Sequence, residues 1–310
     1  MKLLSATFIS VAGVPDTTLS FGANVDGETA RPLTVVTGPP TSGKTRLLEA
    51  ILAAKDVIGP YGQPPMAHEW IRDGENAAKI QLTFRLDEDE IRFTGGIATI
   101  QRAEALFKPQ GSRYEADAAF VSLLERYDHE GRFGKFDYFP ANRSVVQGAG
   151  AHGLSAIEQR LARTTRDPRK YAFLPRFLVQ LTHDANGRAR FEAALEKLSP
   201  TVKYAGSRGD DDLICFSSNG RPKTRATELA SSEADAVIVA ATNALIGHER
   251  SVVFVDRPEL YQGEAGAPAF LSALQGLAAE LQLIVATSSP AILASVDPSC
   301  VIHLQGPGAG

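Results

Sequence analysis

The sequence of 310 residues predicts an α/β fold whose parallel sheet carries a phosphate-binding loop. The first observation is the segment from Gly38 to Thr45, which fits the P-loop pattern G-x-x-x-x-G-K-[ST] at every specified position. The second is that the apolar runs 252–256 and 283–287 alternate with helical patterns. Continuous apolar runs of this length are typical of strands buried on both faces of a parallel sheet.

The elements before the loop are strands, and a helix follows it. Residues 3–21 alternate apolar and polar around a break at 12–16, which predicts two strands of a hairpin. Residues 33–37 are apolar and β-branched, and apolar residues recur at helical spacing within 47–52. The loop therefore joins a buried strand to an amphipathic helix, which is the context that a P-loop requires.

A second hairpin is predicted after this helix. Residues 79–86 alternate cleanly, the acidic segment 87–90 reads as a turn, and residues 91–94 return.

The rest of the chain contains an inserted helical lobe followed by further strands of the sheet. The predicted elements are a helix at 114–127, a core strand at 136–140, helices within 154–198, a strand at 212–217, a helix at 231–246, a strand at 252–256, a helix at 270–281 and a strand at 283–287. We expect three parts: a P-loop lobe with an antiparallel β insertion at 1–140, a helical lobe at 141–200, and the rest of the core at 201–310.

Composition indicates a cytoplasmic protein that does not enter a membrane. No apolar stretch approaches the 18 residues of a membrane span, and the N-terminus does not resemble a signal peptide. Cys215 and Cys300 are the only cysteines, so neither a disulfide framework nor a zinc site is indicated. The net charge of −4 argues against a globally basic nucleic-acid binder.

One region departs from this acidic balance. Residues 141–190 contain nine Arg or Lys against three Asp or Glu. Two interpretations remain open: a solvated helical face with internal salt bridges, or a surface that contacts DNA, RNA or a protein partner.

The P-loop pattern carries specific chemistry. Its glycines let the backbone curl so that successive N–H groups and the helix N-terminus face one phosphate. Lys44 supplies charge to the β- and γ-phosphates, and Thr45 supplies a hydroxyl to Mg²⁺. Phosphate binding is therefore predicted, and hydrolysis is a separate question.

Asp256 ends a buried apolar strand in the manner of a Walker B motif. Open α/β sheets place ligands at the carboxyl ends of their strands, so Asp256 is expected to hold Mg²⁺ opposite Thr45. The alternative is an aspartate that simply ends a strand.

At this point the chain resembles the ABC-type ATPase heads of the SMC, RecF and OLD families, including small AAA-like ATPases of bacterial genome-maintenance and anti-phage systems. The resemblance spans nearly the whole chain. It rests on the order of the parts and on two fairly specific segments, Asp256-Arg257-Pro258-Glu259 and Thr287-Ser288-Ser289-Pro290, where the family reads D-E-P-E and T-H-S-P. The resemblance implies a P-loop NTPase fold, an ABC ATPase-like head with an antiparallel β subdomain and an inserted helical lobe.

The resemblance also implies ATP and Mg²⁺ as cofactors and an active site shared across a dimer. Gln147 would correspond loosely to the glutamine with which the family contacts Mg²⁺. Arg143, on the loop after a core strand, is either a nucleotide or interface contact or an ordinary surface arginine. The residues expected to contact the nucleotide are Gly38, Pro39, Pro40, Thr41, Ser42, Gly43, Lys44, Thr45, Arg46, Arg143, Ser231 and Ser288.

Three departures from the family concern hydrolysis. Arg257 stands where the family has a glutamate as general base, and a cation cannot accept a proton from water. Ser288 replaces a histidine that contacts the γ-phosphate. The segment 229–233 resembles the L-S-x-G-E signature, but Ala230 and Ser232 replace its serine and glycine. These changes predict impaired hydrolysis, unless Glu259 supplies the base.

Two functions follow from the resemblance. The first is an ATP-binding subunit, slow or defective in hydrolysis, that uses Mg-ATP to gate assembly in a bacterial defence or DNA-maintenance complex. It would act as a homodimer, or as a hetero-oligomer with an unidentified effector or second ATPase. The alternative is an active DNA-stimulated ATPase in DNA repair or phage defence. A transporter subunit or a small-molecule kinase explains fewer of the motifs.

Overall fold

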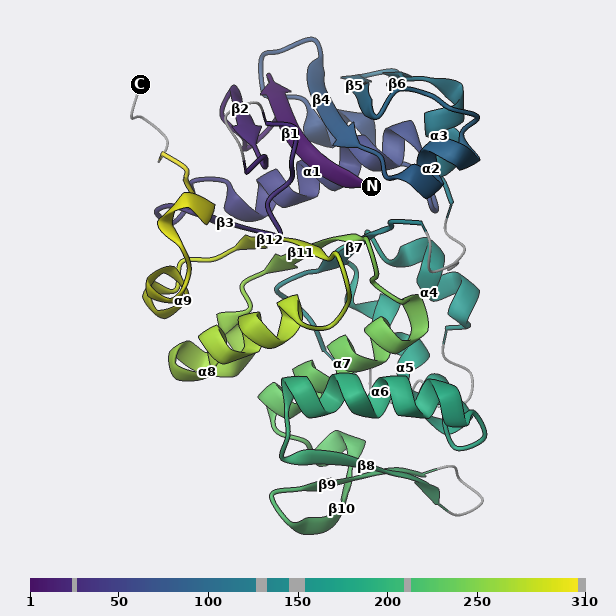
Figure 1. Cartoon of the computed structure of the whole chain (residues 1–310). Helices are drawn as coiled ribbons and strands as arrows, with labels where there is room; N and C mark the ends of the chain where they lie inside the picture. The colour runs from purple at the N-terminus through teal and green to yellow at the C-terminus, as the bar shows by residue number, and fades with distance from the viewer. Residues whose placement is uncertain (24–26, 127–132, 145–153, 209–212, 306–310) are drawn as a thin grey trace.

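The computed structural model describes residues 1–23, 27–126, 133–144, 154–208 and 213–305. Figure 1 shows an antiparallel sheet at one end, a parallel sheet across the middle, and helices with a small second antiparallel sheet at the other end. The predicted α/β class is confirmed. In the part of the chain that is described, no helix is both long enough and apolar enough to cross a membrane.

The N-terminal sheet has the strand order β2-β1-β4-β5-β6. Its first two strands form the hairpin that residues 3–21 predict. The strands are β1 (Lys2–Ile9), β2 (Thr17–Ser20), β4 (Ala78–Arg85), β5 (Ile100–Lys108) and β6 (Gly111–Glu115), and all their pairings are antiparallel.

The predicted hairpin over 79–94 is wrong. The strand β4 is present, but residues 88–93 form the short helix α2 (Glu88–Phe93). The Asp87 carboxylate accepts the Glu90 N–H at 2.9 Å while the Glu90 carboxylate accepts the Asp87 N–H at 3.0 Å. This capping box stabilises a helix start where the alternating pattern favoured a strand, so β4 pairs instead with β5. The helix predicted at 114–127 is shorter, α3 (Ala118–Leu124), because β6 occupies its start.

The parallel sheet holds the predicted core strands in the order β13-β3-β12-β11-β7. Every pairing in it is parallel. The strands are β3 (Leu33–Thr37), β7 (Phe136–Phe139), β11 (Val252–Asp256), β12 (Gln282–Ala286) and β13 (Val301–His303). The strands β3 and β11 run parallel, with β12 between them, so their carboxyl ends lie at the same edge of the sheet. The P-loop follows β3 and Asp256 ends β11, which brings both to this edge.

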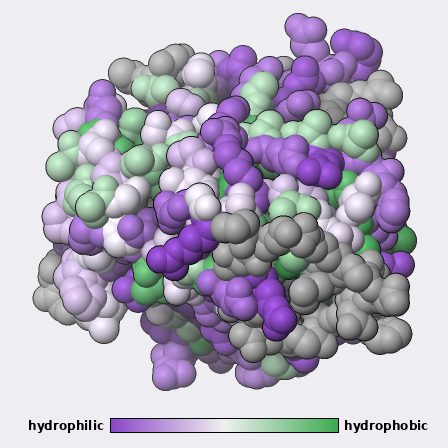
Figure 2. Space-filling model, turned by 90° about the horizontal axis from the view of Figure 1, so that it is seen from below, coloured by the Kyte–Doolittle hydropathy of each residue, from purple (hydrophilic) through white to green (hydrophobic). Residues whose placement is uncertain are grey.

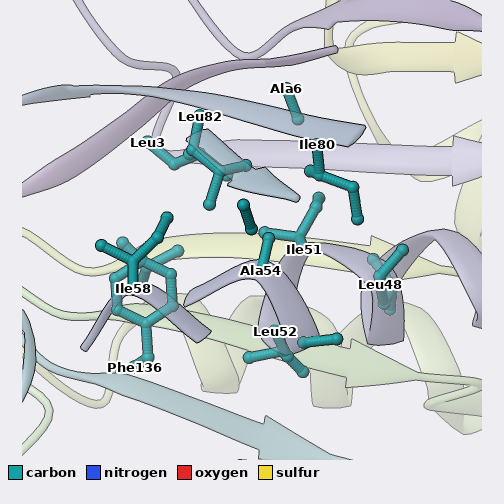
Figure 3. Packing of buried hydrophobic residues seen from close by; sticks show 14 of the residues in the cluster. Leu3, Ala6, Leu48, Ile51, Leu52, Ala54, Ile58, Ile80, Leu82 and Phe136 are labelled. Carbon is teal, nitrogen blue, oxygen red and sulfur yellow. The ribbon is translucent and has the colours of Figure 1, made fainter. Parts of the chain in front are cut away.

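The helix α1 (Lys44–Ile58) lies between the two large sheets (Figure 1). Its apolar residues Leu48, Ile51 and Ile58 meet Leu3 and Ile80 of the antiparallel sheet, as Figure 3 shows. These side chains are fully removed from water. Burial of this kind contributes about 25 cal/mol per Å² of apolar surface, so the core fixes α1, and with it the P-loop, against both sheets.

The other face of the parallel sheet is covered by helices. They are α5 (Leu174–Gln180), α6 (Ala185–Leu198), α7 (Ser231–Ile246), α8 (Glu259–Gln275) and α9 (Pro290–Ser295), with the 3₁₀ segment η3 (Pro168–Phe173). The helix α4 (Ala156–Ala162) packs against η3, and the 3₁₀ segment η1 (Ala67–Trp70) packs against the antiparallel sheet at β5 and β6. A second apolar core joins α5, α6, α7 and α8 to this face. The helices predicted within 154–198 are thus present, interrupted by η3.

A three-stranded antiparallel sheet, with the order β10-β9-β8, extends beyond α6. Its strands are β8 (Val202–Arg208), β9 (Leu213–Ser218) and β10 (Arg221–Arg225). The sequence analysis found only β9. Figure 2 views the molecule from this end and shows hydrophilic and hydrophobic residues interspersed over it.

Candidate nucleotide site at the strand ends

The P-loop adopts a conformation that only glycine accommodates at two positions. Gly43 has φ +86°, and a Cβ there would lie 2.4 Å from the carbonyl oxygen of Gly13. Gly38 has φ +155°, and a Cβ there would lie 2.5 Å from the carbonyl oxygen of Leu304. The first Gly and the second Gly of the motif are therefore required by backbone packing as well as by turn geometry.

Lys44, the first residue of α1, folds back over the loop. Its Nζ donates to the carbonyl oxygens of Gly38 and Pro39, each at 2.8 Å, and lies 3.4 Å from the Ser42 hydroxyl. Burial lowers its pKa, and Asp256 opposes that effect. The ammonium of Lys44 thus lies at the mouth of the loop, and phosphate oxygens could replace the two carbonyl oxygens as its hydrogen-bond acceptors.

Thr45 and Asp256 meet across the sheet edge. The Thr45 hydroxyl donates to Oδ2 of Asp256 at 2.9 Å, although the two residues are 211 positions apart. The other carboxylate oxygen, Oδ1, is buried and has no hydrogen-bond partner among the described residues. Burial raises the pKa of Asp256. A carboxylate with one unpaired oxygen beside a hydroxyl is the kind of oxygen site that Mg²⁺ takes, so these residues fit the ion.

Arg257 follows Asp256 in a left-handed conformation, with φ +49°. Its N–H donates to the carbonyl of Ala286 at 2.8 Å, and its side chain is more than half exposed. The guanidinium lies 3.9 Å from the Glu259 carboxylate. A cation therefore occupies the rim of the candidate site directly after Asp256.

Glu259 begins α8 beside the end of β12. Its Oε2 accepts the hydroxyl of Thr287 at 2.9 Å, and the same Thr287 oxygen accepts the N–H of Ser289 at 2.9 Å. The side chain of Glu259 is only 11% exposed. The carboxylate is thus oriented by the neighbouring strand end, and Thr287 is a site residue that the sequence analysis did not single out.

Arg143 lies in the core and is fully engaged with the protein. Its Nε donates to Oδ1 of Asp235 at 2.6 Å, and its Nη1 donates to the carbonyls of Pro140 at 2.8 Å and of Asp256 at 3.0 Å. Only 2% of the residue is exposed. Arg143 therefore ties the end of β7 to α7 and β11. The signal that could have found its partner is Asp235, an acid that lies beyond the capping Glu233 at the start of the apolar part of α7.

Arg46 is also committed to protein partners. Its Nε donates to the carbonyl of Ala12 at 3.1 Å, another nitrogen donates to the Glu69 carbonyl, and the guanidinium lies 3.7 Å from the centre of the Trp70 ring. Because its guanidinium is engaged in this way, Arg46 would contact a nucleotide through its backbone N–H.

The remaining predicted contacts lie at the outer parts of the site. Ser231 starts α7 and is exposed, and Ser288 is exposed just after β12. The carboxylate of Glu233 accepts the Ala230 N–H at 2.9 Å and the Ser218 hydroxyl, so the signature-like segment caps its own helix. Gln147 lies outside the described residues.

A hollow of about 520 Å³ opens beside the loop. Thr41 and Ser42 form one wall, and Gly13, Val14 and Arg72 form part of the other. This space adjoins the phosphate cradle and has room for the base and ribose of a nucleotide.

Comparisons with known proteins found matches among solved structures only. No family model and no curated protein matches the chain. Solved SMC head domains match nearly its whole length, so the chain has the fold of an SMC head domain.

Three of these structures indicate the degree of likeness. The SMC head bound to the C-winged-helix domain of ScpA has a TM-score of 0.62 at 15% identity over 97% of this chain and 93% of that chain. The SMC head domain from Thermotoga maritima has 0.54 at 14%, over 98% and 94%. The SMC head with an extended coiled coil bound to the C-terminal domain of ScpA, derived from Pyrococcus furiosus, has 0.61 at 13%, over 97% and 92%.

Proposed function

We propose that the chain is an ABC-type ATPase subunit that binds Mg-ATP at the P-loop. The observation that carries this proposal is the pairing of Thr45 with Asp256, whose second oxygen is buried and unpaired in the described structure. The ion, when bound, supplies charge neutralisation for the phosphates. Lys44 exchanges its backbone carbonyl partners for phosphate oxygens, and the loop N–H groups hold the phosphate.

We further propose that hydrolysis is slow or defective. Removal of a general base costs about 10²- to 10⁴-fold in rate. Arg257 cannot act as this base, and its positive charge favours retention of the anionic nucleotide over turnover. Glu259 is the alternative base, but its carboxylate already accepts the Thr287 hydroxyl.

The proposed role of the bound nucleotide is to gate assembly in the cytoplasm. Two of the structural neighbours are bound to domains of ScpA, which supports a head that docks a partner protein. The partner here would be a second copy, another ATPase or an effector of a defence or DNA-maintenance system. A ligand present at 100 times its dissociation constant stabilises the competent state by about 2.7 kcal/mol, which suffices without hydrolysis.

The alternative, an active DNA-stimulated ATPase, rests on the basic segment 141–190. Three of its nine basic residues, Arg143, Arg163 and Lys170, are buried. Others pair with acids, as Arg169 does with Asp167 and Arg188 with Glu192. The exposed surface of this segment therefore carries much less excess positive charge than the sequence count suggests. This favours the ATP-gated assembly subunit over the DNA-stimulated ATPase.

The deciding experiment measures ATP binding and turnover side by side on the purified chain, with DNA added and omitted. We expect tight binding that Lys44→Ala weakens by roughly 10- to 100-fold, negligible turnover, and partial recovery of turnover in Arg257→Glu. Arg257→Gln is the matched control, because it removes the cation without adding a base. Ready turnover by the natural chain would contradict the proposal, and Glu259→Gln would then test the alternative base.

A further inference from the structure

A second cavity, of about 200 Å³, lies on the side of α1 that faces η1 and the segment between α4 and η3. Its floor consists of the buried residues Leu52, Ala53, Trp70 and Tyr138, and its rim includes the exposed Glu69 and Arg166. Arg46 is the only lining residue that also belongs to the predicted nucleotide contacts. The cavity and the phosphate cradle therefore share one predicted contact residue, and both border α1.

Two hydrogen-bond donors in the floor of this cavity have unmet capacity. The Tyr138 hydroxyl and the Trp70 indole N–H are both buried, and neither has a hydrogen-bond partner in the described structure. The two residues are 1% and 6% exposed. Burial raises the pKa of Tyr138, so its hydroxyl keeps its proton. An unpaired buried donor is unfavourable, and a ligand oxygen that accepts from it would offset that cost.

The same cavity offers one under-used acceptor. The carboxylate of Glu49 lies 3.8 Å from Arg46 and 3.9 Å from Arg166, distances beyond a hydrogen bond. Burial raises its pKa. The other deep carboxylate, Asp56, is already occupied, because it accepts the Thr164 hydroxyl at 2.8 Å and lies 3.2 Å from the Lys55 ammonium.

The charges around the cavity balance. Two arginines and three acids line it, and Lys55 offsets the third acid through Asp56. A ligand with a net charge would therefore leave an uncompensated ion in a partly buried site, which is unfavourable. The volume corresponds to roughly seven water molecules, which is the space of a single small ring system.

We propose that this cavity is a second ligand site, for a neutral planar molecule of nucleobase size with an amide-like edge. The carbonyl oxygen of such an edge accepts from Tyr138 and Trp70, and its N–H donates to Glu49. The aromatic and aliphatic floor covers the ring. The bound molecule would join α1 to the segment that leads into η3, and so connect the P-loop helix to the helical lobe.

The test uses uracil and nicotinamide as probes, each titrated by calorimetry into the full chain and into Lys44→Ala. We expect both proteins to bind the probes equally. Tyr138→Phe and Glu49→Gln should each weaken binding by about tenfold, the effect of one lost hydrogen bond. Tyr114→Phe, at an exposed tyrosine of β6, is the matched control and should change nothing. Tyr138→Phe removes only an unpaired hydroxyl, so the variant should fold normally.

Three results would overturn the proposal. Neither probe binds, in which case the cavity holds water only. Mg-ATP displaces the probes from the natural chain and Lys44→Ala no longer binds them, which would assign them to the nucleotide site. Binding persists unchanged in both cavity variants, which would place the probes elsewhere on the molecule.

Discussion

The two sides of the candidate nucleotide site use their charges differently. On the loop side, which comprises Gly38 to Arg46, the ammonium of Lys44 rests on backbone carbonyls of its own loop. On the strand side, the charged side chains of Arg143, Asp235 and Glu259 are held in hydrogen bonds to other elements, whereas Asp256 keeps one carboxylate oxygen unpaired in the described structure. The loop side therefore keeps the charge of Lys44 available for a ligand. On the strand side, the charged groups of Arg143, Asp235 and Glu259 mainly hold the strand ends together. Loss of a loop-side charge should impair binding, and loss of a strand-side charge should impair folding.

The largest effect is expected from Arg143→Met. This change leaves Asp235 buried with only the Gln262 amide, which donates to it at 3.1 Å. Breaking a buried ion pair on one side costs about 3–5 kcal/mol, so the free energy of unfolding should fall by that amount in urea denaturation. The double variant Arg143→Met with Asp235→Asn should recover part of the loss. A loss below about 1 kcal/mol would break the comparison, because the pair would then not organise the strand side.

The next effect is on ligand binding, in Lys44→Ala. Hydrogen bonds to charged groups contribute about 1.5–3 kcal/mol, so ATP affinity should fall by roughly 10- to 100-fold. The free energy of unfolding without nucleotide should change by no more than about 0.5 kcal/mol. Fluorescence titration with an ATP analogue and denaturation of the same samples measure both quantities. Lys108→Ala, at the exposed end of β5, is the control, and a large loss of stability in Lys44→Ala would erase the distinction between the sides.

A third prediction concerns Lys170, a residue of η3 whose ammonium contacts the backbone of β7, next to the strand side of the site. Its Nζ donates to the carbonyls of Arg163 at 2.8 Å, of Thr165 at 3.0 Å and of Tyr138 on β7, and burial lowers its pKa to about 7. The unfolded chain keeps the ordinary pKa of 10.5. Between these values the unfolded state binds more protons, so this residue's contribution to stability rises with pH, by at most about 1.4 kcal/mol per pH unit.

The measurement compares the natural chain with Lys170→Met by urea denaturation at about pH 6.5 and about pH 8.5. We expect the difference in the free energy of unfolding to shift in favour of the natural chain at the higher pH. A constant difference would mean that the buried ammonium stays charged throughout this range.

The smallest effect is expected at Arg257, where the strand side carries backbone strain. A left-handed conformation costs a residue other than glycine roughly 1–2 kcal/mol. Glycine avoids this strain, but it also makes the unfolded chain more flexible, which offsets part of the gain in stability. Arg257→Gly should therefore raise the free energy of unfolding by up to about 1 kcal/mol. Arg257→Ala removes the same side chain but keeps the strain, so it should show no such gain. Equal free energies of unfolding of the two variants would show that the φ of +49° costs little stability at this position.

Several elements were predictable because their signals are local. The strand β3, the P-loop and α1 follow from a fixed motif and its apolar flanks, and β11 and β12 follow from continuous apolar runs. The helix α2 carried an equally local signal, the Asp87 and Glu90 capping box, but the alternation around it suggested a strand. The strand β10 is short and polar, and the alternation of β8 is interrupted at Gly206, where its register with β9 shifts, so neither strand shows a long periodic pattern.

The sequence by itself determined the tight turn of residues 38–45, because these eight consecutive residues contain the glycines that the loop conformation demands. The roles of Lys44, Asp256 and Arg257 toward a nucleotide stay predictions from the sequence. Only the tertiary structure decided which charges face a ligand. Arg143 meets Asp235 across 92 residues and Thr45 meets Asp256 across 211, and no local pattern encodes such contacts. The physical reason is that the burial and pairing of a charge depend on which elements the sheet brings together, whereas the shape of a tight loop depends on its own backbone.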